Sequence, residues 1–151
     1  MLFVQFSVNH NRYILSAKHI LSVIPLLTIH KMTGVPEYMV GHINYKGQTI
    51  PVVDLSKLLS GKKSKTRLST RIILVNYSSD AGRHIILGLI AEKATEVVKL
   101  LESDFTSNKI TSDSAPFLGS IANDSEGMLQ KIDIDTLINL KVRDYLDIQA
   151  A

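Results

Sequence analysis

The sequence contains no cysteine and no tryptophan. Without cysteine the chain has no disulfide, no thiolate metal ligand and no cysteine nucleophile. No window reaches the run of about 18 apolar residues that a membrane-spanning helix needs, so we predict no membrane insertion. The N-terminal stretch MLFVQFSVNHNRY alternates apolar with polar residues and has neither a basic start nor a small-residue cleavage site. It indicates a strand and not a signal peptide, and these absences together predict a protein of the reducing cytoplasm.

A large excess of charge of one sign is also absent, because 17 Lys and Arg oppose 14 Asp and Glu. The densest basic stretch carries Lys62, Lys63, Lys65 and Arg67 among glycine, serine and threonine. A nucleic-acid site would be expected to interleave aromatic stacking residues with the charges, and this stretch contains none. We therefore interpret it as a solvated surface loop and predict no nucleic-acid partner.

The sequence contains no recognisable catalytic or metal-binding pattern. Its five histidines never stand two to four residues apart, as paired metal ligands on one element would. No window fits the G-x-S-x-G elbow of serine hydrolases. Asp133 and Asp135 precede an apolar helical pattern, where carboxylates cap the helix and favour its dipole. We predict no catalytic residue, no metal ligand and no cofactor.

Short apolar runs separated by turn residues dominate the rest of the chain. The expected strands cover residues 2–8, 12–15, 20–27, 71–77, 84–91, 117–121 and 128–132, with connecting loops at 28–36, 60–69 and 101–116 and a strand or turn at 96–101. Ser16 is expected to cap a short helical turn, and a helix with apolar residues at helical spacing is expected to run from 133 or 135 to about Leu146. Many short strands at close spacing favour small barrels over a doubly wound sheet.

The most informative segment is 41–59, which reads GHINYKGQTIPVVDLSKLL. Two β-prone runs flank a turn at Lys46-Gly47, and Asp54 opens a short leucine-rich turn. This pattern predicts a β-hairpin followed by a capped helical turn. Gly47 can adopt a positive φ at no steric cost, and Pro51 indicates a strand edge or a bulge.

This segment resembles the signature of the CheW-like adaptor domains of bacterial chemotaxis, G-x-x-N-x-R-G-x-x-x-P-V-x-D-L. The residues in register are Gly41, Asn44, Gly47, Pro51, Val52, Asp54 and Leu55, and Lys46 replaces the usual Arg. A second element, LGLIAEKATEVV at 87–98, resembles V-G-L-x-V-D-x-V-x-E-V and includes Gly88. A third, MLQKIDIDTLI at 128–138, resembles the closing strand and helix start of the family.

The resemblance implies a mainly β fold of two small five-stranded β-barrels packed around a shared hydrophobic core, with short helices and a C-terminal helix. Residues 1–151 would form a single domain of two intertwined barrel subdomains. The implied function is that of a non-catalytic adaptor joining the regulatory domain of a CheA-type histidine kinase to the cytoplasmic tip of a chemoreceptor. It would work in the cytoplasm, in receptor arrays at the inner membrane face. The alternatives are a divergent adaptor of a type IV pilus or other chemosensory pathway and, third, a nucleic-acid- or ligand-binding β domain.

A docking surface on such a fold is expected to be an apolar strip with a polar rim. Segment 20–23 aligns with a usual V-x-E-V, so Ser22 stands where Glu is usual, as Lys46 stands where Arg is usual. The two replacements remove a possible charge pair or bidentate contact, because lysine cannot reproduce the arginine fork. The predicted partner-binding residues are Ile20, Ser22, Ile43, Tyr45, Lys46 and Ile50. The predicted fold-signature residues are Gly41, Asn44, Gly47, Pro51, Asp54 and Gly88.

Overall fold

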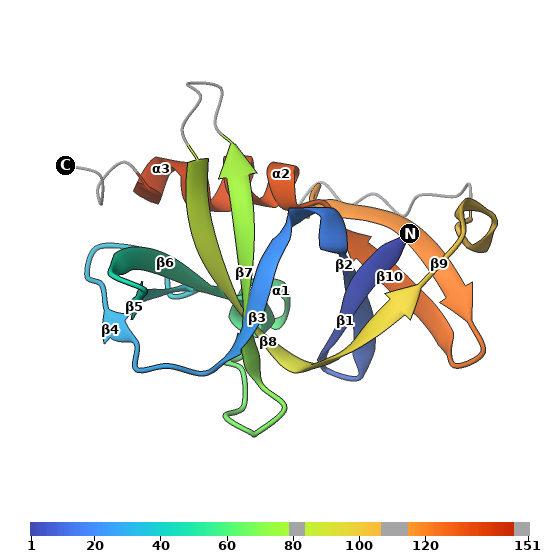
Figure 1. The fold of residues 1–151 in the computed structure, drawn as a ribbon, viewed down its shortest axis with the longest axis horizontal. Coiled ribbons are helices and arrows are strands. Elements are labelled where there is room, and N and C mark those ends of the chain that lie inside the picture. Colours follow the sequence, from blue (N-terminus) through green and yellow to red (C-terminus); the bar gives the residue numbers. More distant parts are fainter. Residues whose placement is uncertain (79–83, 107–114, 147–151) are drawn as a thin grey trace. The chain divides into compact units, whose positions relative to one another are not determined.

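The computed structural model describes residues 1–78, 84–106 and 115–146 (Figure 1). The chain divides into two compact units. The first comprises Met1–Lys18 and Thr95–Ala151, and the second comprises His19–Ala94. Strand β8 (His84–Lys99) contributes residues to both ranges.

The first unit is built on a sheet in the order β1-β2-β10-β9. Its strands are β1 (Leu2–Val8), β2 (Asn11–Ser16), β9 (Leu118–Asp124) and β10 (Gly127–Ile132). β2 and β10 run parallel, and the other two pairs are antiparallel. The expected turn at Asn9 and His10 is confirmed, because both residues adopt the left-handed φ that a tight turn requires. A buried apolar cluster lies in this unit, formed by Phe3, Ile14, Leu100, Ala122 and Leu129.

Short helical segments complete the first unit. Ser16 accepts a hydrogen bond from the Lys18 N–H at the start of η1 (Ala17–His19), as predicted. A further 3₁₀ turn, η2, covers Glu102–Asp104. The C-terminal helix runs through α2 (Ile134–Leu137), the π-helical η3 (Ile138–Val142) and α3 (Arg143–Leu146). Of the two candidate caps, Asp133 and Asp135, Asp133 is the one that caps the helix, and its side chain accepts from the Thr136 N–H at 3.2 Å. The helix therefore begins where the sequence predicted and continues to Leu146, the last described residue.

The second unit contains a sheet in the order β4-β5-β6-β8-β7-β3. Its remaining elements are β3 (Ile20–Pro25), β4 (His30–Lys31), β5 (Met39–Tyr45), β6 (Gln48–Asp54), α1 (Leu55–Ser60) and β7 (Arg71–Ser78). β6 and β8 are parallel, and the other neighbours are antiparallel. The core is a cluster of buried aliphatic residues: Ile43, Ile50, Val52, Ile72, Leu74 and Ile90.

The mainly β class with a helix near the C-terminus is confirmed, but three details differ from expectation. The expected loop 28–36 contains β4, because His30 and Lys31 pair with β5. The strand expected at 84–91 does not end at Ala91 but continues as β8 to Lys99, which takes in most of the strand or turn expected at 96–101. Among the described pairings, the second unit's sheet ends at β4 and β3, and the expected barrel closure does not occur there. Half of the expected loop 101–116, residues 107–114, lies outside the described residues, as does most of the segment between the strands expected at 71–77 and 84–91.

Candidate partner-binding site

The signature hairpin β5–β6 ends in a tight turn. Tyr45 pairs with Gln48, and between them Lys46 and Gly47 adopt φ values of 49° and 80°. Positive φ at both central residues is the requirement of a type I′ turn, whose twist matches that of the strands. The Lys46 Nζ lies 5.3 Å from the centroid of the Tyr45 ring. The tip therefore presents an exposed cation within cation–π distance of a half-buried aromatic ring.

Two of the predicted partner-binding residues are excluded from the surface. Ile43 and Ile50 face one another across the hairpin, and both are 0% exposed. They pack in the core of the second unit, so their side chains cannot form a docking strip. This part of the prediction is wrong, because the apolar face of the hairpin covers the core and not a partner. Tyr45 packs partly against the same cluster and keeps a share of exposed surface.

The other two predicted residues, Ile20 and Ser22, lie on β3. Both are half-buried, and in the described sheet β3 pairs with β7 alone. A register shift between Ile20 and Ser22 bends this edge strand. In the sheet order, β6, β8 and β7 separate β3 from β5. The predicted site is therefore divided between the hairpin tip and the β3 edge, which are not neighbours in the sheet.

Steric crowding explains why glycine is needed at two of the fold-signature positions. A Cβ at Gly41 would overlap the backbone carbonyl oxygen of His30, so glycine allows β4 to approach β5. At Gly88 a Cβ would lie 3.0 Å from the Cγ2 of Ile72 and 3.3 Å from that of Val52, inside the core. These two glycines thus permit close packing of neighbouring strands.

Two further signature residues lie on the strands of the hairpin. Pro51 is buried opposite His42, one residue before the β6–β8 ladder begins at Val52, so its missing N–H falls outside that ladder. Asn44 is exposed and lies opposite Thr49.

Asp54 is the signature residue whose side chain accepts four hydrogen bonds. It is 5% exposed and caps α1 by accepting from the Ser56 N–H at 3.0 Å and the Lys57 N–H at 3.3 Å. The cap was predicted, but a second function was not. The same carboxylate accepts from the backbone N–H of Ser64 at 2.9 Å and from the Ser64 Oγ at 2.6 Å. Asp54 therefore fixes both the helix and the loop that follows it.

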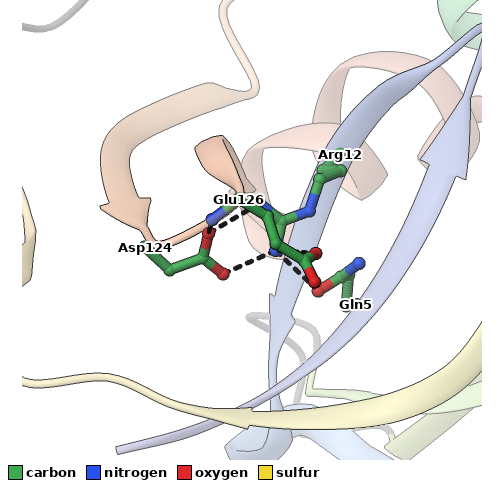
Figure 2. A network of polar contacts seen from close by, with 4 residues as sticks. All are labelled: Gln5, Arg12, Asp124 and Glu126. Atoms are coloured by element: carbon green, nitrogen blue, oxygen red, sulfur yellow. Dashed lines mark hydrogen bonds and ion pairs between the residues drawn. The ribbon is translucent and has the colours of Figure 1, made fainter.

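A polar network in the first unit was not predicted from the sequence (Figure 2). Arg12 donates two hydrogen bonds to the Asp124 carboxylate, at 2.8 and 2.5 Å, and one to the Gln5 Oε1 at 3.1 Å. Glu126 lies 3.6 Å from the same guanidinium. The hydrogen bond from Arg12 lowers the pKa of Asp124 to about 2. The two partners are 112 residues apart, so no local spacing could have revealed the pair.

Histidines and acidic residues do not assemble into a metal centre in the described part of the chain. His30 and His42 stack across β4 and β5 with ring centroids 5.4 Å apart, a pairing that the sequence spacing did not suggest. Within residues 1–78, 84–106 and 115–146, no group of three metal-ligating side chains is present. None of the helices in this part of the chain has the length and apolar character of a membrane span.

Comparison with known proteins matches this architecture to one family. The model of the CheW-like domain matches residues 2–142. The chemotaxis protein CheW of Bacillus subtilis (strain 168) is 28% identical over 138 residues, which cover 90% of this chain and 85% of that protein. The chemotaxis protein CheW of Helicobacter pylori is 22% identical over 102 residues, 68% of this chain and 59% of that protein. The crystal structure of the scaffolding protein TtCheW from Thermoanaerobacter tengcongensis superimposes with a TM-score of 0.73 at 29% identity, covering 87% of this chain and 82% of that one.

The protein is thus a β-rich scaffold of the kind that acts by docking, and the chain belongs to the CheW-like domain family. Members of this family are non-catalytic adaptors that couple receptors and CheA in chemotaxis. The chain accordingly functions as a chemotaxis adaptor and not as an enzyme.

Proposed function

We propose that this adaptor joins the regulatory domain of a CheA-type histidine kinase to the cytoplasmic tip of a chemoreceptor. It would do so in the cytoplasm, within receptor arrays at the inner face of the membrane, as one CheW-like domain spanning residues 1–151. The observation that carries the proposal is the match of the family model over residues 2–142, together with a signature hairpin that departs from the family pattern at Lys46.

The receptor-facing surface proposed here consists of the hairpin tip and the β3 edge. At the tip, Tyr45 offers part of an aromatic ring and Lys46 a cation held above it. On β3, Ile20 and Ser22 lie half-buried beside Leu21, which is 48% exposed. Apolar surface flanked by polar groups is suited to a helical partner, whose own apolar stripe can be covered while its polar rim stays solvated.

The side chains at 22 and 46 set the chemistry of that contact. Ser22 carries no charge, and Lys46 provides a point charge in place of a planar guanidinium. A receptor that depends on a bidentate arginine contact would therefore bind weakly here. We propose that the cognate receptor tip uses single hydrogen bonds and apolar contact at these two positions.

A second candidate, an adaptor of a type IV pilus or other chemosensory pathway, is favoured by the same two replacements. Both candidates use the same fold and differ in the partner. The genes that neighbour this one would discriminate them, because a kinase with a CheW-like domain beside receptor genes supports the first and pilus genes support the second. A nucleic-acid partner stays the third candidate, and the absence of aromatic residues from the basic stretch argues against it.

The proposal is tested by calorimetric titration of the purified protein with the regulatory domain of the kinase from the same genome. We expect saturable binding at micromolar or tighter dissociation constants and co-elution in gel filtration. A parallel titration uses a cytoplasmic fragment of the receptor. Absence of heat and of co-elution with the kinase domain would count against the proposed coupling.

A further inference from the structure

The loop of residues 61–69, here called the basic loop, carries four exposed cations. Lys62, Lys63, Lys65 and Arg67 are all exposed between α1 and β7. In the described part of the chain none of these four side chains forms an ion pair. The loop therefore concentrates positive charge that the rest of the described chain does not neutralise by direct contact.

The backbone of the basic loop is held in place by buried side chains. At its middle, the buried Asp54 carboxylate accepts from the N–H and the Oγ of Ser64. At its end, the hydroxyl of Thr70, which is 2% exposed, donates to the carbonyl oxygen of Lys65 and accepts from the Arg67 N–H. A loop fixed at both places loses little conformational entropy when a partner binds it.

An apolar side chain stands among the charges. Leu68 is 100% exposed, the largest exposed fraction among the large hydrophobic residues of the described chain. It follows Arg67 directly, on the segment that Thr70 anchors. A fully exposed leucine in the same short loop as four exposed cations provides both the apolar and the charged groups of an interface.

The basic loop lies at the opposite end of β6 from the hairpin tip. β6 begins at Gln48, beside the turn, and ends at Asp54, which anchors the loop. A seven-residue strand separates the two places by about 20 Å. An adaptor must hold two partners at once, so a second partner needs a surface away from the first. The basic loop provides such a surface within the same unit.

We propose that the basic loop is the docking surface for the regulatory domain of the kinase, and that this domain offers an acidic patch around an apolar recess that receives Leu68. The inference rests on the proposed function, since that function names the kinase as a partner. A protein surface fits better than a nucleic acid, because the loop has no aromatic residue for stacking. It fits better than a lipid surface, because the loop has a fixed shape and a single apolar residue.

The test compares three variants in binding kinetics with the kinase regulatory domain at low and high salt. The loop variant replaces the four basic residues of the basic loop by glutamine. The control variant removes the same charge from exposed lysines elsewhere: Lys18, Lys31, Lys93 and Lys99. The third variant is Leu68→Ser. Thermal unfolding of all three confirms that each is folded.

We expect the loop variant to lose about tenfold or more in association rate at low salt and most of its salt dependence, because rim charges act on encounter. The control variant should change the rate by no more than about twofold, and Leu68→Ser should mainly raise the dissociation rate. Equal losses in the loop and control variants, or no loss in either, would overturn the inference. Loss of binding to the receptor fragment or to phosphatidylserine–phosphatidylcholine vesicles, with kinase binding intact, would assign the loop to another partner and overturn it too. Failure of the unmodified protein to bind the kinase would instead defeat the proposed function itself.

Discussion

Replacing Asp54 by alanine should destabilise the protein far more than the loss of an ordinary helix cap. The buried carboxylate accepts from two N–H groups at the start of α1 and from the N–H and hydroxyl of Ser64. Asp54→Ala removes all four hydrogen bonds at once. The side chain therefore has two structural roles: it caps α1, and it accepts the hydrogen bonds that anchor Ser64 of the basic loop.

The expected loss in the free energy of unfolding is the sum of the contributions from these two roles. Loss of a capping side chain costs about 1 kcal/mol, within a range of roughly 0.5–2. The donors of Ser64 would lose their acceptor in a half-buried place, at a further cost of about 1–2 kcal/mol. We expect Asp54→Ala to lower the free energy of unfolding by about 2–4 kcal/mol in total. Ser64→Ala removes only the hydrogen bond from the Ser64 hydroxyl to Asp54 and should cost about 1 kcal/mol.

The assay is urea unfolding of Asp54→Ala, Ser64→Ala and the double variant, with Asp133→Ala as matched control. Asp133 also caps a helix, but it is exposed and its side chain accepts from the Thr136 N–H alone among the cap contacts. The control should lose only the cap contribution, about 1 kcal/mol or less. The double variant should be nearly as stable as Asp54→Ala, since the Ser64 contribution is already lost. Equal losses in the free energy of unfolding for Asp54→Ala and Asp133→Ala, or strict additivity in the double variant, would refute the role of Asp54 in anchoring Ser64.

Three further predictions concern other parts of the molecule. The folded pKa of Asp124, about 2, lies below the unfolded value of about 3.9, so its stabilising contribution is complete above that value and is lost as the pH falls toward about 2. Arg12→Gln should flatten the pH dependence of the urea midpoint in that window, and an unchanged profile would contradict the pairing. Gly41→Ala should cost about 2–3 kcal/mol, because its Cβ would overlap a backbone carbonyl; a melting temperature equal to that of the parent protein would disprove this steric reason. Ser22→Glu and Lys46→Arg should each change affinity for the receptor fragment, because each alters the charge or hydrogen-bonding group offered at its position; no effect of either on receptor binding would remove both positions from the proposed surface.

Local signals in the sequence predicted the elements of the fold well. Lys46-Gly47 between two β-prone runs predicted the hairpin turn, and both residues adopt the positive φ that this turn demands. Asp133 before an apolar helical pattern predicted the cap of the C-terminal helix. In both cases the cause of the structure lies within a few residues of the element. The two-residue strand β4 was missed because it forms only by pairing with β5, whose glycine lets it approach.

The prediction for the hairpin surface failed for a different reason. Strand alternation places residues on one of two faces, and the hydrophobic pattern directs the apolar face toward the core. Ile43 and Ile50 were assigned to a partner, whereas the elementary expectation is that an apolar face turns inward. The Arg12–Asp124 pair could not be predicted at all, since its members meet only through the parallel pairing of β2 with β10 and the β9–β10 hairpin. Interactions at this sequence separation leave no periodic signal.

Asp54 is a signature residue that the fold requires and that can also affect partner binding. Its cap and its bonds to Ser64 are sufficient physical reasons for an aspartate, because a buried carboxylate needs its hydrogen-bond donors. Asp54 is buried, and a partner meets the exposed cations and Leu68 beyond it. Any effect of Asp54 on docking must then pass through the position of the basic loop. Ser64→Ala tests this route, since it removes the hydroxyl bond between the loop and Asp54 while leaving the helix cap and the bond from the Ser64 N–H intact.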